Sequence, residues 1–169
     1  MRFPLLLIVL GVGAMGTRAR AEESCGPKSA LCWQNVERGA TGPRVMALQY
    51  LLRARGYNLA PDGKFAFATE SVLRRFQRKN RLKVDGKAGW QSWEALTPNL
   101  QAGARGNAVR GLQTMLVQAG YKVTRDGVFG ASTQKALVSF QRPIGLIGSD
   151  GRATDPVWCY LTGGRFDGE

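Results

Sequence analysis

One repeated segment decides how this chain folds. Its first copy is LQYLLRARGYNLAPDGKFAFATESVLRRFQ, residues 48–77. Its second copy, LQTMLVQAGYKVTRDGVFGASTQKALVSFQ, begins 64 positions later and covers residues 112–141. The matches combine apolar residues at helical spacing with Asp-Gly turns and a few polar residues, and chance does not produce such a combination twice. The chain is therefore expected to contain two tandem copies of one structural unit.

The repeat continues beyond this segment in both directions. It begins at Gly42 in the first copy and at Gly106 in the second, and a one-residue insertion after Leu146 moves the offset to 65. The later matches are Asp85-Gly86 with Asp150-Gly151, Ala88 with Ala153, Trp93 with Trp158 and Leu96 with Leu161. Each unit has about 60 residues, which is close to the lower limit for a domain with one core. That length leaves no room for a deep catalytic cleft and favours a binding module.

Hydrophobic spacing predicts three helices in each unit, and hence an all-α protein. In the first unit, Val45, Leu48 and Leu52 form the apolar stripe of the first helix. Pro43 suits the start of this helix, and Gly56 suits its end. The second unit repeats this arrangement at the same spacing.

The second helix of the first unit is predicted at residues 68–80. Its apolar face consists of Thr69, Val72, Leu73 and Phe76. A short third helix follows, and its Trp93, like the counterpart Trp158, is expected in the core. Pro143 arrives earlier than any helix breaker of the first unit, so the second helix of the second unit should be shorter.

Residues 1–21 have the features of a cleaved signal peptide. Arg2 precedes an apolar run at residues 5–12, and Ala19-Arg20-Ala21 provides a cleavage site between small residues. The run is shorter than the about 20 apolar residues that span a bilayer, although an N-terminal membrane anchor is the alternative. The remaining divisions are an irregular Cys-containing lead-in (22–41), module 1 (42–98), a linker (99–105), module 2 (106–163) and a tail (164–169). We expect an exported protein, periplasmic or associated with the cell wall, without a transmembrane segment after cleavage.

The expected mature chain is basic. It carries 21 basic and 12 acidic residues, a net charge of +9. Residues 39–98 contribute +7 and residues 99–163 contribute +4, so the excess lies in the modules. A basic surface attracts anionic partners such as nucleic acid, acidic lipid or acidic wall polymer. Export makes nucleic acid the least suitable of these, and we predict no nucleic-acid partner.

Three cysteines and the absence of histidine limit the chemistry of the chain. A disulfide is expected in an exported protein, and the odd number leaves one thiol over. Cys25–Cys32 would close a short loop, whereas Cys32–Cys159 would tie the lead-in to the last helix. We prefer the second pairing because a longer closed loop constrains the unfolded chain more. Without histidine or a paired C-x-x-C motif, neither a metal site nor a cofactor is predicted.

The order of these motifs resembles the peptidoglycan-binding type 1 domain, a small three-helix module. Its pattern is V-x-x-L-Q, G-Y, D-G-x-F-G-x-x-T, F-Q, a second D-G and T-W-x-x-L. Module 1 carries it as Val45, Leu48-Gln49, Gly56-Tyr57, Asp62-Gly63-Lys64-Phe65, Thr69, Phe76-Gln77, Asp85-Gly86, Trp93 and Leu96. Module 2 carries it as Val109, Leu112-Gln113, Gly120-Tyr121, Asp126-Gly127-Val128-Phe129-Gly130, Thr133, Phe140-Gln141, Asp150-Gly151, Trp158 and Leu161. The resemblance covers residues 42–97 and 106–162.

The resemblance implies peptidoglycan binding and does not imply catalysis. Members of this family usually accompany a wall hydrolase or transpeptidase domain and deliver it to the wall, so a separate enzyme of that kind is the expected partner. The chain departs from the family pattern at four positions. Ala66 and Thr154 stand where the family has Gly, and Ser92 and Val157 stand where it prefers Thr. The second half of module 2 is thus the most altered part.

Aromatic and basic residues are the first candidates for ligand contact. Tyr57 and Tyr121 follow helix-ending glycines, where a partly exposed ring with a hydroxyl suits a sugar or a peptide stem. Arg74, Arg75 and Arg78 lie on the polar face of a helix, and guanidinium groups pair well with the carboxylates of peptide stems. A solvated helix face is the alternative interpretation of the arginines.

Asp62 and Asp126 are further candidates, because Asp-Gly turns are repeated in both modules. The alternative is structural: the Asp side chain caps backbone amides and the Gly adopts a positive φ. The repeated glutamines, such as Gln49 and Gln113, lie next to core positions and are predicted to bond the loop backbone.

Two other functions remain open. A small wall hydrolase would need paired carboxylates, but most aspartates are turn residues and only Glu70 and Glu94 are glutamates within the modules. A generic polyanion binder would lose its ligand in moderate salt and show no preference for peptidoglycan. We predict a protein that is not an enzyme and whose two modules gain avidity on a repetitive polymer.

Overall fold

The computed structural model describes residues 33–146 and 150–163. The predicted signal peptide, the tail at 164–169 and most of the lead-in lie outside the described residues. Cys25 and Cys32 lie outside them too, so both disulfide pairings stay predictions. Cys159, the third cysteine, is fully buried in the last helix.

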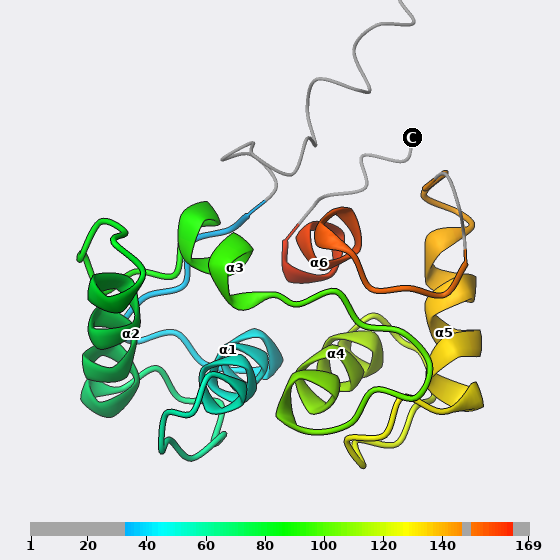
Figure 1. The fold of residues 1–169 in the computed structure, drawn as a ribbon, viewed down its shortest axis with the longest axis horizontal. Coiled ribbons are helices and arrows are strands. Elements are labelled where there is room, and N and C mark those ends of the chain that lie inside the picture. The colour runs from blue at the N-terminus through cyan, green and yellow to red at the C-terminus, as the bar shows by residue number, and fades with distance from the viewer. Residues whose placement is uncertain (1–32, 147–149, 164–169) are drawn as a thin grey trace, which may run out of the picture.

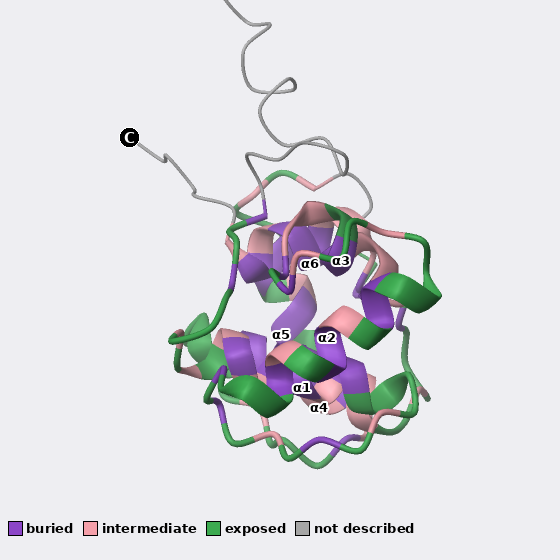
Figure 2. Ribbon diagram, turned by 90° about the vertical axis from the view of Figure 1, so that its left-hand side faces the viewer, coloured by how far each residue is buried: buried purple, intermediate pink, exposed green. Residues whose placement is uncertain are grey.

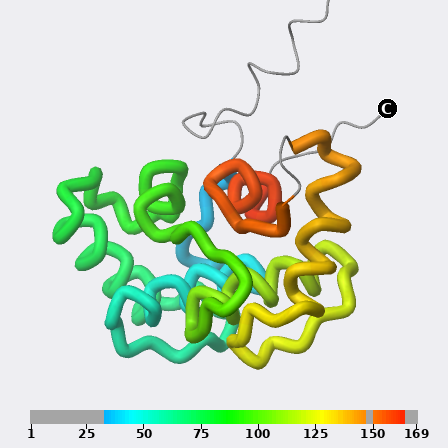
Figure 3. The backbone as a smooth tube through the Cα atoms, turned by 45° about the vertical axis from the view of Figure 1, so that its right-hand side comes forward, coloured from blue at the N-terminus to red at the C-terminus, as the bar shows by residue number. Residues whose placement is uncertain are grey.

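The described residues form six helices and contain no β-strand, which confirms the predicted all-α fold (Figure 1). The helices are α1 (Pro43–Ala54), α2 (Phe67–Lys79), α3 (Trp90–Leu96), α4 (Asn107–Gln118), α5 (Ala131–Gln141) and α6 (Asp155–Thr162). Helices α1 to α3 belong to module 1, and α4 to α6 belong to module 2. The two modules lie side by side, with α1 and α4 adjacent at the centre (Figures 1 and 3).

Helix α2 shows why these segments are helical. Its face with Val72, Leu73 and Phe76 is buried, and Arg75 and Arg78 on the opposite face are exposed. Such a stripe forms a stable helix mainly by packing against its neighbours. The counterpart α5 has 11 residues against 13 in α2, which confirms the shortening predicted from the proline that follows α5.

One hydrophobic core runs through both modules. Trp93 and Trp158 are fully buried, as predicted, and belong to the same cluster of buried side chains as Phe65 and Phe129. Figure 2 shows the buried residues on the inner faces of the helices and the exposed ones outside. The modules therefore form one folded body.

Helices α1 and α4 form the main contact between the modules. Gly111 of α4 is buried there, and a Cβ placed on it would lie 3.4 Å from the carbonyl oxygen of Ala47 in α1. Ala47 is the repeat counterpart of Gly111, so the two helices meet through equivalent positions. Small residues at both positions let the helix backbones approach closely.

The lead-in and the linker also take part in the modules. The backbone of Val36 pairs with that of Ala88, with N···O distances of 2.8 and 3.2 Å, and Leu100 pairs in the same way with Ala153. Trp33 stacks on Trp93 at a centroid distance of 6.2 Å. The structural repeat thus begins at residues 36 and 100, before the first sequence match.

A buried glutamine ties each Asp-Gly turn to its helix, an arrangement that we call a glutamine clamp. The Gln49 side-chain nitrogen donates to Asp62 Oδ1 (2.7 Å), to the Lys64 carbonyl (3.1 Å) and to Thr69 Oγ1 (3.1 Å). The Gln49 side-chain oxygen accepts a hydrogen bond from the Gly63 amide at 2.8 Å. One side chain therefore satisfies groups in the turn and at the start of α2.

Within the residues that the structure describes, the clamp occurs four times, twice in each module. The Gln77 clamp holds Asp85, Gly86, Lys87 and Ser92, and the Gln113 clamp holds Asp126, Gly127, Val128 and Thr133. The Gln141 clamp bonds Gly151 and Arg152, and Val157 stands where the others have a hydroxyl. This confirms that the glutamines bond the loop backbone, and it shows that each module is itself built from two similar halves.

Replacing Thr133 by valine is expected to lower the free energy of unfolding by about 1 kcal/mol. The substitution preserves the shape of a fully buried side chain and removes the hydroxyl that Gln113 contacts at 3.1 Å. Urea denaturation followed by circular dichroism measures the change. Val157→Thr is the converse variant. It should lower the free energy of unfolding by less than a usual buried Val→Thr change, because Gln141 can bond the new threonine hydroxyl. A cost near zero for Thr133→Val, together with the usual full cost for Val157→Thr, would show that the hydroxyl contributes nothing to the clamp.

Candidate functional site

Three of the predicted site residues line one open groove on module 1. The groove has a volume of about 500 Å³ and is lined by Arg55, Gly56, Tyr57, Arg75, Arg78 and Lys79. It lies where the loop after α1 meets the C-terminal half of α2. Arg55 lines the groove as well, although it was not among the predicted ligand-binding residues. Only the fold brings the end of α1, where Arg55 lies, next to the basic face of α2.

The loop after α1 fixes Tyr57 in the groove. Gly56 adopts a φ of 88°, which turns the chain at the helix end, and the Tyr57 amide donates to the Leu52 carbonyl at 3.2 Å. The Tyr57 ring packs edge-on against Phe76, with centroids 6.3 Å apart. Arg75 lies over the same ring, with its guanidinium carbon 5.7 Å from the centroid. The half-buried ring therefore forms a fixed wall beside a cation.

Arg55 is held in place by helix α3. Its guanidinium donates to the carbonyl oxygens of Ala95 (2.8 Å) and Leu96 (3.1 Å) at the end of α3. A cation at this position complements the partial negative charge of a helix C-terminus. Arg55 thus connects the groove to α3.

The groove carries an uncompensated positive charge. Arg75, Arg78 and Lys79 are exposed, and no carboxylate in residues 33–146 or 150–163 forms an ion pair with any of them. Arg78 and Lys79 lie three and four residues after Arg75, so both are neighbours of Arg75 on the surface of α2. A concave surface with several cations and an aromatic wall suits an anionic ligand.

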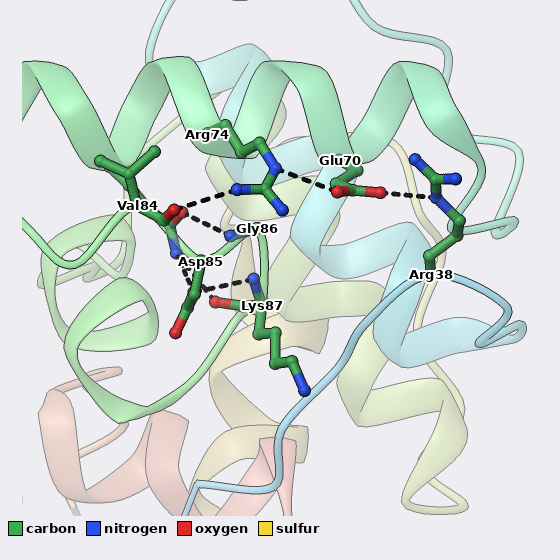
Figure 4. Close-up of polar contacts among 8 residues, drawn as sticks. Arg38, Glu70, Arg74, Val84, Asp85, Gly86 and Lys87 are labelled. Atoms are coloured by element: carbon green, nitrogen blue, oxygen red, sulfur yellow. Dashed lines mark hydrogen bonds and ion pairs between the residues drawn. The ribbon is translucent and has the colours of Figure 1, made fainter.

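Arg74 lies outside this groove and supports the module (Figure 4). Its guanidinium pairs with Glu70 Oε1 at 3.0 Å and donates to the Val84 carbonyl at 3.0 Å. Arg38 pairs with the other oxygen of Glu70. The hydrogen bond from Arg74, followed by that from Arg38, lowers the pKa of Glu70 despite partial desolvation. Arg74 therefore links α2 to the loop before α3.

Asp62 and Asp126 lie in the clamped turns, away from the groove. Asp62 accepts hydrogen bonds from the Lys64 amide (2.9 Å) and from Gln49, and these bonds lower the pKa of its carboxyl. Asp126 accepts the equivalent bonds from the Val128 amide and Gln113, with the same effect on its pKa. Both carboxylates are engaged by their own turns.

Tyr121 has the same packing as Tyr57 but different neighbours. Its ring meets Phe140 edge-on at 6.1 Å, and its hydroxyl donates to the Ser139 carbonyl at 3.1 Å. The repeat places Ala119, Ser139 and Pro143 where module 1 has Arg55, Arg75 and Lys79. Of the four cations that line the groove of module 1, only Arg78 keeps a basic counterpart, Arg142.

Module 2 has a different hollow of about 380 Å³. It is lined by Asn99, Leu100, Gln101, Ala104, Arg152 and Thr154. None of the predicted site residues lies in it, and its lining includes one cation. It is the weaker candidate for an anionic ligand.

The described residues contain no group of three or more metal-ligating side chains. Among the same residues, no helix has the length and apolar character that would let it cross a membrane.

Comparison with known proteins finds the same repeat. The family "Putative peptidoglycan binding domain" matches the chain twice, at residues 41–96 and 105–158. Two curated relatives, both spore cortex-lytic enzymes of Bacillus cereus, are 42% identical to it over 64 residues. That match includes 37% of this chain and 25% of each relative, so the chain spans a quarter of the relatives' length. A solved peptidoglycan-binding protein from Clostridioides difficile, in complex with glutamine hydroxamate, is 32% identical, with a TM-score of 0.38 over 38% of this chain and 41% of that one.

Proposed function

Because the chain belongs to the peptidoglycan-binding domain family, we propose that it is an exported, non-catalytic protein that binds the cell wall through the groove of module 1. The observation that carries this proposal is the position of Tyr57, Arg75 and Arg78 in a single open groove. Each was a separate candidate in the sequence, and the fold brings them together. The protein would then anchor in the wall or bring a separate hydrolase or transpeptidase to it.

The environments of Asp62, Asp126 and Glu70 argue against a role for these three carboxylates as a catalytic acid. A glycosidase needs a carboxylic acid with a raised pKa beside a second carboxylate. Asp62, Asp126 and Glu70 instead have lowered pKa values, because hydrogen bonds from amides or arginine stabilise their charged forms. The lytic activity named for the relatives is not carried over to this chain, because the match includes only a quarter of their length.

Co-sedimentation with insoluble peptidoglycan tests the proposal. The chain from residue 22 onward, without the predicted signal peptide, is mixed with purified peptidoglycan at increasing salt, with cellulose and an anionic resin as controls. We expect binding to peptidoglycan that persists at physiological salt and exceeds binding to either control. Zymography on the same walls should show no clearing. Equal binding to the resin that disappears with salt would favour the polyanion binder, and clearing would favour the hydrolase.

A further inference from the structure

We propose that the groove of module 1 binds the free carboxylates of peptidoglycan stem peptides, and that module 2 is a structural partner without an equivalent site. This inference rests on the proposed function and specifies which part of the polymer is recognised. It also replaces the expectation of two binding modules per chain with one.

The charge of the groove selects the stem peptide. Within peptidoglycan, the glycan chain offers neutral hydroxyl and amide groups, whereas the stem peptides carry free carboxylates. Arg75, Arg78 and Lys79 present cations along one face of α2 without carboxylate partners among the described residues. Guanidinium groups form paired hydrogen bonds with carboxylates, and such charge-assisted bonds are stronger than neutral ones.

Tyr57 supplies the second element of recognition. Within the described part of the chain its hydroxyl has no hydrogen-bond partner, whereas the hydroxyl of Tyr121 donates to the Ser139 carbonyl. The Tyr57 ring is fixed between Phe76 and Arg75, so little side-chain freedom is lost when a ligand binds. The groove can therefore hold an extended peptide segment against the ring while the cations hold its carboxylates.

Module 2 lacks this combination in both charge and geometry. Ser139 and Pro143 replace Arg75 and Lys79, which removes two cations from the counterpart of the groove. The Tyr121 hydroxyl is already satisfied there. Module 2 nevertheless packs closely on module 1 through α4 and α1, as a module with a structural role must.

The test compares two doubly substituted variants with equal loss of charge. R75S/K79S removes two cations from the groove, and Ser139 shows that serine is accepted at the counterpart of residue 75. K122S/K135S removes two exposed cations of module 2 that lie outside the groove and form no ion pair in the described part of the chain. Both variants are first checked for wild-type helicity and thermal stability by circular dichroism.

Binding is measured on three preparations of phosphate-free peptidoglycan: untreated, amidated at its carboxylates, and stripped of stem peptides by an amidase. We expect wild-type protein and K122S/K135S to bind untreated walls equally. R75S/K79S should bind them about tenfold more weakly or worse, because its lost contacts are charge-assisted. Wild-type binding should fall by a similar factor on amidated and on stripped walls. The amidase leaves a free lactyl carboxylate on the glycan for each stem that it removes, so a fall on stripped walls assigns the ligand to the stem peptide and not to any wall carboxylate. Saturation on untreated walls should not change when Tyr121 is replaced by alanine.

The outcomes separate this inference from the proposed function. If wild-type protein does not bind untreated walls, the proposed function itself is wrong. If it binds them but amidation or R75S/K79S leaves the affinity unchanged, only the carboxylate assignment is wrong. Equal losses for R75S/K79S and K122S/K135S would show that overall charge, and not the groove, holds the wall. Restored binding on addition of phosphate-bearing wall polymer to amidated walls would assign the groove to phosphate instead.

Discussion

Replacing Gln49 by leucine is expected to lower the free energy of unfolding by about 3 kcal/mol, since each buried polar group left unsatisfied costs about 1–3 kcal/mol. Leucine has nearly the volume of glutamine, so the change removes hydrogen bonds without opening a large cavity. The Gly63 amide would lose its acceptor, Thr69 would lose its donor, and Asp62 would keep only the hydrogen bond from the Lys64 amide. Gly63 is buried, so its amide has no access to water as a replacement.

The effect is measured by urea denaturation, from the shift in the midpoint at an unchanged m value. Gln118→Leu is the matched control, because Gln118 is exposed at the end of α4 and a surface substitution changes stability by at most about 0.5 kcal/mol. A loss below 1 kcal/mol for Gln49→Leu would show that the turn keeps its conformation without the clamp.

The glutamine clamps also show how far the sequence predicts the structure. The repeated glutamines stand out because a polar residue recurs beside core positions such as Leu48, and an Asp-Gly turn follows at fixed spacing. Their bonds to the loop backbone were predicted on that basis. The identity of Ser92 and Thr69 as hydroxyl partners was not, because the hydroxyls lie 15 and 20 residues from their glutamines and only folding brings them together.

The lining of the candidate groove could be predicted only in part, and the reason is geometric. Arg74 and Arg75 are adjacent in sequence and look alike, yet α2 directs Arg74 toward Glu70 and Arg75 toward the Tyr57 ring. A rotation of about 100° per residue along a helix separates such neighbours. The sequence shows a basic face, but the third helix and the loop after α1 decide which of its residues line a groove.

The contact between the modules was expected only in general terms. A short linker indicates that they touch, whereas avidity requires two separate binding units. The packing of α1 on α4 and the shared core show one body. Any two sites on it would lie at a fixed distance, so they would benefit from multivalency only where the spacing of the polymer matches. A single groove on a rigid support needs no such match.

Replacing Gly111 by leucine is expected to lower the free energy of unfolding by about 1–3 kcal/mol, the usual cost of forcing extra volume into a packed core. The new side chain would extend toward the Ala47 carbonyl, the Leu51 side chain and Tyr50, which already lie 3.4 to 3.6 Å from the position of a Cβ. The two helices would have to separate, and the core that they share would loosen. The position is helical with ordinary φ, so backbone strain does not contribute to this cost.

Gly111→Ala is the control that isolates the added volume. Its single carbon fits at ordinary contact distance, and alanine favours a helix over glycine by about 0.5–1 kcal/mol, so this variant should equal or exceed the wild type in stability. Chemical denaturation of the three proteins gives the comparison. Because α1 and α4 lie at the centre and the groove lies beyond α1, the folded Gly111→Leu protein should still bind peptidoglycan. If leucine were tolerated as well as alanine, the modules would pack loosely, and α1 and α4 would not be the contact that makes the two repeats one domain.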